Sequence, residues 1–66
     1  MTRLQIVRDL IANLEKRYAT LQYQKGVLEQ AWSESVKAGI PAIQKEMDAV
    51  LVALREAEVE ESRLTR

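Results

Sequence analysis

Apolar side chains recur in alternating steps of three and four residues along almost the whole chain. From Leu4 to Ser35 this spacing selects ten positions, of which eight are apolar. From Ile40 to Leu64 it selects eight positions, of which seven are apolar. Such heptad spacing is typical of helices that bury one stripe of side chains, here named the seam, against a neighbouring helix. The pattern therefore predicts an all-α fold in which helices pack along their length.

Two helices joined by a tight turn account for the pattern. Thr2 suits the N-cap of the first helix, and Gln5 three residues later completes a capping-box sequence. Gly39 suits the left-handed position that ends a helix, and Pro41 suits the first turn of the next one. The sequence thus predicts one antiparallel hairpin domain over residues 1–66, with a helix over about 3–36, a turn at 37–40 and a helix over about 41–64.

Gly26 leaves a three-helix alternative open, because a glycine preceded by Lys25 is typical of a helix C-terminus. The heptad phase continues from Leu21 to Leu28 without a reset, which favours a continuous helix that tolerates about 1 kcal/mol for an internal glycine. In the hairpin Gly26 is then expected near Ala53, where it allows a close backbone approach. Lys25 itself occupies the seam, so it is expected either to extend its ammonium to the edge or to specify the register.

The predicted hairpin has a core and an overhang. At about 1.5 Å per residue the first helix is about 51 Å long and the second about 36 Å long. A turn at Gly39 and Ile40 places Leu64 beside Leu14 or Glu15, so the residues before Leu14 extend about 15 Å beyond the second helix. The expected hairpin core comprises Tyr18, Leu21, Leu28, Trp32, Ile43, Met47, Val50 and Leu54.

A second set of apolar residues has no partner within this hairpin. The overhanging "LQIVRDLIANL", residues 4–14, is the most apolar stretch of the first helix, and further apolar side chains lie off both seams. Exposed apolar surface of this extent marks interaction sites, and two-fold dimers are the commonest oligomers. We therefore expect a homodimer with a four-helix core, parallel or antiparallel, or a docked target protein. The expected self- or partner-interface comprises Leu4, Ile6, Val7, Leu10, Ile11, Leu14, Tyr23, Leu51, Val52 and Val59.

The composition argues against catalytic and ligand-binding chemistry. The chain has no cysteine and no histidine, and ten basic residues balance ten acidic ones. Disulfides and thiolate sites are excluded, and zinc or imidazole chemistry lacks its usual ligands. A net charge of zero also disfavours nucleic acid as a partner, because its binders carry a basic excess. We therefore expect no enzymatic activity, no catalytic residue, no cofactor and no metal, and we interpret Glu56, Glu58, Glu60 and Glu61 as a solvated face.

The hydropathy pattern indicates a cytoplasmic protein without membrane association. No apolar run approaches the roughly 20 residues that span a bilayer. Arg8 and Asp9 interrupt the N-terminal apolar stretch, so it does not have the pattern of a signal peptide.

The leading hypothesis is a small interaction protein, a homodimeric regulator, inhibitor or adaptor that binds a target protein through exposed apolar and aromatic residues. In length, hairpin pattern and the Gly-x-Pro turn "GIP" at residues 39–41, the chain is similar in shape to the helical-hairpin chaperones of type III secretion needle subunits. That resemblance implies export or assembly chaperoning as an alternative function. A further alternative is an RNA- or DNA-binding hairpin dimer that resembles the plasmid copy-number repressor in architecture.

Overall fold

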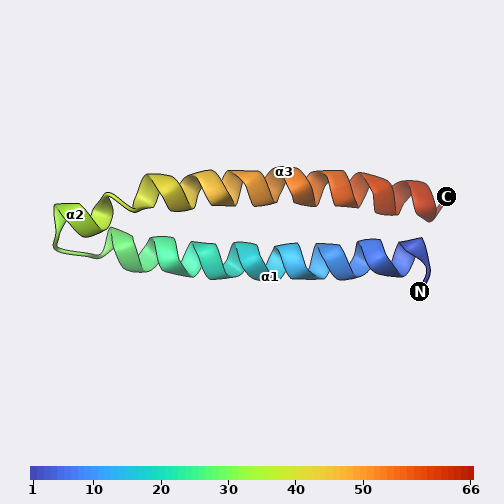
Figure 1. Ribbon diagram of the computed structural model, residues 1–66, viewed down its shortest axis with the longest axis horizontal. Helices are drawn as coiled ribbons and strands as arrows, with labels where there is room; N and C mark the ends of the chain where they lie inside the picture. Colours follow the sequence, from blue (N-terminus) through green and yellow to red (C-terminus); the bar gives the residue numbers. More distant parts are fainter.

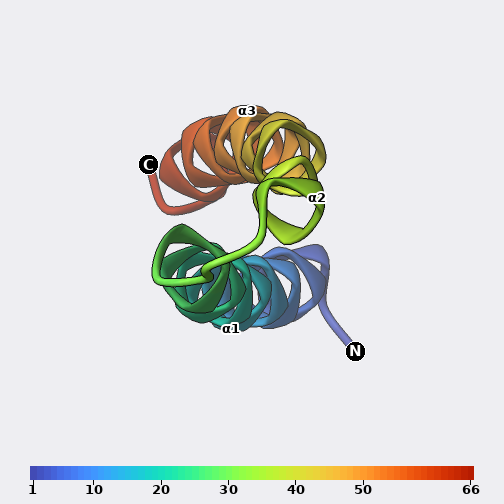
Figure 2. The same cartoon turned by 90° about the vertical axis from the view of Figure 1, so that its left-hand side faces the viewer.

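The computed structural model describes residues 1–66, in which two long helices form an antiparallel hairpin (Figure 1). Helix α1 spans Arg3–Glu29, the single turn α2 spans Glu34–Lys37, and α3 spans Ile40–Leu64. Both termini lie at one end of the hairpin, and α2 closes the other end. The hairpin measures 50 × 16 × 13 Å, and Figure 2 shows α1 and α3 as two slightly crossed helices seen from the closed end. The predicted all-α hairpin is confirmed.

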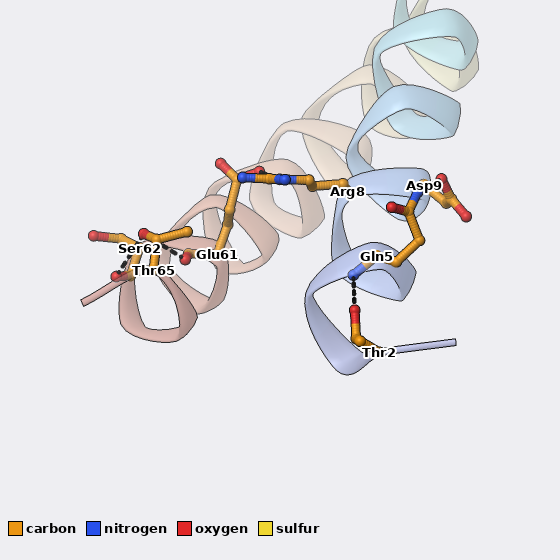
Figure 3. A network of polar contacts seen from close by, with 7 residues as sticks. All are labelled: Thr2, Gln5, Arg8, Asp9, Glu61, Ser62 and Thr65. Carbon is orange, nitrogen blue, oxygen red and sulfur yellow. Dashed lines mark hydrogen bonds and ion pairs between the residues drawn. The ribbon is translucent and has the colours of Figure 1, made fainter.

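Capping residues fix the ends of the long helices. The Thr2 hydroxyl accepts a hydrogen bond from the Gln5 backbone N–H at 3.2 Å, as the sequence predicted (Figure 3). The Gln5 side chain donates to Asp9 at 2.9 Å and does not return to Thr2, so only half of the capping box forms. Pro41 lies in the first turn of α3, also as predicted. At the other end, Thr65 is the C-cap of α3, and its backbone N–H donates to the carbonyl oxygen of Glu61.

The core is one stripe between α1 and α3, and the heptad seam predicts it as far as Leu28. All five buried residues belong to the seam: Val7, Leu21, Met47, Val50 and Ala57. Leu14, Tyr18 and Ile43 pack against the cluster formed by Leu21, Met47 and Val50. The predicted core residues Leu28 and Leu54 are half-buried. A helix pair buries one stripe on each helix, so the core remains thin.

The first helix is shorter than the heptad spacing predicted. Helix α1 ends at Glu29 instead of continuing to about residue 36, and a loop leads from there into α2. The two long helices therefore have nearly equal lengths of 27 and 25 residues. Arg3 at the start of α1 consequently reaches Glu60 near the end of α3. The predicted overhang is thus wrong, because α3 covers the α1 seam along its whole length.

Predictions for three residues near the turn also differ from the structure, in which α1 ends earlier than predicted. Trp32 follows the helix and is fully exposed, so its predicted place in the hairpin core is wrong. Gly39 has right-handed helical geometry, with φ −76° and ψ −15°, and caps the start of α3 instead of ending α1 in the left-handed region. Gly26 lies inside a continuous α1 as predicted. However, a methyl group there would meet no atom within 4 Å, so the expected close approach near Ala53 is wrong.

Candidate interaction surfaces

Two ion pairs connect α1 and α3 along one flank of the hairpin. Arg3 pairs with Glu60, and Arg17 pairs with Glu46 at 3.2 Å. The two arginines are two heptads apart, as are the two glutamates, so both pairs lie on the same side of the seam. All four side chains are more than a third exposed, so each pair contributes at most about 1 kcal/mol. The two ion pairs mainly show which side chains of α1 and α3 lie along this flank.

The same flank carries three of the exposed apolar residues of α1. Leu10 lies midway between Arg3 and Arg17 in the sequence, and Ala53 lies midway between Glu46 and Glu60. Heptad spacing therefore places Leu10 of α1 and Ala53 of α3 on this flank, each between the two ion-pair residues of its own helix. Ile6 and Val27 lie three heptads apart on the adjacent line of α1. We name this surface the Leu10 face and define it by Ile6, Leu10, Val27, Ala42, Ala49 and Ala53, of which only Ala53 is not classed as exposed.

A shallow groove lies near the closed end, where Val27 borders it. The groove has a volume of about 320 Å³ and an apolar exposed surface. Gln24 and Val27 form one wall from α1, and Ile43 forms the other wall from α3. Because Gln24 is one heptad after Arg17, the groove opens on the Leu10 face. The groove and the protruding Leu10 thus lie on one surface at opposite ends.

The other flank of the hairpin is polar. Arg8 follows a seam residue directly whereas Leu10 precedes one, which places the two side chains on opposite flanks. Arg8 pairs with Glu61 at 3.3 Å (Figure 3). The sequence indicated that Glu61 is part of a solvated face, and in the structure it has a partner on α1. The Lys25 ammonium donates to Gln44 at 2.6 Å from the edge of the seam, as expected for a lysine whose stem is partly buried.

The closed end carries a separate group of exposed apolar side chains. Trp32 is fully exposed in the loop between α1 and α2, and Val36 on α2 is exposed as well. A tryptophan is large and apolar, and it normally buries 150–250 Å² when it packs, so full exposure to water is unfavourable. Aromatic side chains of this kind are typical anchors of protein interfaces. Sequence reasoning assigned Trp32 to the hairpin core, because the heptad phase placed it in the seam.

The structure divides the predicted self- or partner-interface into two groups. Val7 is buried, and Leu4, Ile11 and Leu14 are half-buried, as seam residues of the hairpin that α3 covers. In the predicted hairpin the overhang left these four residues uncovered by the second helix. The structure has no overhang, so they belong to the hairpin core. Leu51 is half-buried on α3. The remaining predicted interface residues are exposed: Ile6, Leu10, Tyr23, Val52 and Val59.

Comparison with protein-family models, with curated proteins and with solved structures gives no match to this chain. Considered separately, neither long helix combines the length and the apolar character that crossing a membrane requires. The functional argument therefore starts from the two exposed surfaces, the Leu10 face and the closed end.

Proposed function

We propose that this protein is a small non-enzymatic interaction module, a homodimeric regulator, inhibitor or adaptor that binds a target protein through exposed apolar and aromatic residues. One observation carries the proposal. Only five of the 66 residues are buried, whereas ten large hydrophobic residues are exposed. A chain that leaves this much apolar surface in water is suited to a function in which other protein surfaces cover it.

The energetics of a small core support a homodimer. A single core in a chain of this size rarely supplies more than about 3–5 kcal/mol, and association is a common source of additional stability. The hairpin exposes 5181 Å², whereas a compact 7.6 kDa monomer exposes about 4,300 Å². This excess of exposed surface is about 900 Å². In an interface of standard size each partner buries a similar area, about 800 Å². A dimeric four-helix bundle would bury surface of that amount.

The separation of the two surfaces supports a second, different partner. The Leu10 face runs along one flank of α1 and α3, whereas Trp32 and Val36 lie at the closed end. A dimer formed along the flank leaves the closed end accessible. Trp32 then acts as the anchor that enters an apolar pocket of the target protein, with Val36 beside it. Binding of this kind regulates a target by occupying its surface and requires no chemistry from the module.

Site-specific photocrosslinking in the cells that produce the protein tests the target-binding part of the proposal. A benzophenone amino acid replaces Trp32 in one variant and Gln22, an exposed residue on the polar flank, in the control. We expect a discrete adduct with another protein from position 32 and none from position 22. With that protein purified, Trp32→Ala should weaken binding more than about tenfold, whereas Gln22→Ala should not. Identical adducts from both positions, or unchanged affinity of Trp32→Ala, would contradict the proposal.

A further inference from the structure

We infer that the second copy of the chain docks on the Leu10 face in antiparallel orientation, so that the two closed ends point in opposite directions. The inference rests on the proposed homodimer and specifies its geometry. It identifies which of the two flanks is the self-interface and which residues meet across it.

The α1 part of the Leu10 face is arranged symmetrically about Arg17. Leu10 lies one heptad before Arg17 and Gln24 one heptad after it, while Ile6 and Val27 lie just outside these positions at almost equal distances. A two-fold axis that crosses the hairpin at Arg17 therefore places Leu10 of one copy beside Gln24 of the other. The same axis places Ile6 beside Val27. Such a self-complementary surface is what an isologous dimer requires, because every contact across the axis occurs twice.

The groove near the closed end receives the side chains that protrude near the open end. Leu10 is 48% exposed in the single hairpin, and Ile6 is 53% exposed. In the antiparallel dimer these two side chains of one copy enter the groove that Gln24, Val27 and Ile43 form on the other. Apolar side chains thus move from water into an apolar groove, and each copy fills the groove of the other.

Helix α3 fits the same axis. Ala49 and Ala53 lie on either side of the midpoint of α3, just as Arg17 lies near the midpoint of α1. The axis therefore places Ala49 of one copy beside Ala53 of the other. The distance between packed helices depends on the side chains at the contact, and alanines permit a close approach. The two α3 helices can consequently come together while the α1 side chains interlock.

The charges on the Leu10 face are balanced at the axis. The side chains of Arg17 and Glu46 are both more than half exposed, so each can accept a further partner. The axis brings the two Arg17 side chains together, and the Glu46 of each copy offsets their repulsion. A polar pair at the centre of an apolar interface favours one register over its neighbours, as polar seam residues do in coiled coils.

Neither alternative arrangement of the dimer places Leu10 and Ile6 in the groove of the partner. A parallel dimer, with both closed ends together, places Leu10 over the end of the partner's α3, where Glu56 and Glu60 lie, and leaves the two grooves facing each other. Docking on the polar flank would cover the paired Arg8 and Lys25, and α1 has no large apolar side chain there to bury with them. On the Leu10 face the central ion pair is accompanied by three large apolar side chains of α1, which gain free energy on leaving water.

Spin-label distances combined with solution mass test the inference. The chain has no cysteine, so Ser35→Cys gives a single label at the closed end. In the antiparallel dimer the label-to-label separation should approach the 50 Å length of the hairpin, whereas a parallel dimer gives a far shorter separation. Leu10→Glu should raise the dimer dissociation constant more than about 100-fold, because it places a charge in the groove. Val52→Glu is the matched control, since Val52 is 54% exposed but lies on the outer side of α3.

The outcomes separate the inference from the proposed function. A wild-type dimer with the long separation, lost in Leu10→Glu and retained in Val52→Glu, supports both. A dimer with a short separation, or one that dissociates in Val52→Glu and not in Leu10→Glu, keeps the homodimer and overturns its geometry. A wild-type monomer at every concentration overturns both. Circular dichroism verifies that each variant remains helical, and if Leu10→Glu unfolds, the label separation decides alone.

Discussion

Replacing Gly26 by alanine should stabilise the protein. Gly26 lies in the last turn of α1, without positive φ, and a methyl group at this position would meet no atom within 4 Å. Glycine in a helix interior is about 0.8–1 kcal/mol less favourable than alanine, because it loses more conformational freedom on folding. Gly26 lies three residues before the end of α1 and no contact opposes the added methyl group, so the gain in stability should reach at most that difference. For a chain of this size the upper bound corresponds to a rise in Tm of about 4–8 °C.

Thermal unfolding followed by circular dichroism measures this effect. Wild type and Gly26→Ala are compared at the same protein concentration, because the Tm of a dimer depends on concentration. Ala19→Gly is the matched control. Ala19 is exposed, lies one heptad before Gly26 on the same line of α1, and should lose about 1 kcal/mol when replaced.

A decrease in the Tm of Gly26→Ala, or weaker dimerisation of this variant, would refute the reasoning. Gly26 follows a seam residue, so it lies on the polar flank with Arg8, away from the Leu10 face. A destabilising methyl group would therefore mean that another backbone packs against the polar flank. In that case the inferred dimer geometry would be wrong together with the predicted gain in stability.

Substitutions at three further positions test the core, the cap and the closed end by the same thermal assay. Leu21→Ala removes the centre of the core and should cost about 2–5 kcal/mol, enough to unfold the hairpin; an unchanged Tm would contradict the core assignment. Thr2→Ala should cost about 0.5–2 kcal/mol and Thr2→Ser much less, since serine retains the hydroxyl that caps α1; equal losses in both would argue against the cap. Trp32→Ala should change stability by less than about 0.5 kcal/mol, because the side chain is fully exposed; a larger loss would place Trp32 in the folded core.

The stripe of core residues could be predicted because it is a local property of the sequence. A heptad period determines which side of a helix is apolar before any partner is known. Leu21, Met47 and Val50 were predicted as core on this basis, and all three are buried. Val7 and Ala57 follow the same period and are also buried, although Val7 had been assigned to the interface. The N-cap at Thr2 and the proline in the first turn of α3 are equally local features.

The end of α1 could not be predicted from the period, because the phase of a heptad does not report whether the helix continues. Trp32 and Ser35 keep the phase although α1 has already ended at Glu29. The ending is favoured by a non-local requirement, namely that each turn of α1 should have a turn of α3 beside it. One local signal was available, since Ser33 followed by Glu34 is typical of a new helix N-terminus.

Which residues of the candidate interface are exposed depended on the position of the turn, so their exposure was predicted only in part. Leu4, Ile11 and Leu14 were assigned to an interface because the overhang left them uncovered, and in the structure they are half-buried seam residues. Ile6 and Tyr23 lie off the seam whatever the position of the turn, and both are exposed. Residues off the seam were thus the more dependable indicators of an outer surface.

Sedimentation equilibrium across a concentration series tests the central claim, that this thin hairpin functions as a homodimer. The account predicts a mass of twice the 7.6 kDa of the chain at high concentration, with reversible dissociation on dilution. A stable, helical monomer of 7.6 kDa throughout the series would contradict it. The hairpin would then be sufficient by itself, and the Leu10 face would remain in water until another protein covers it.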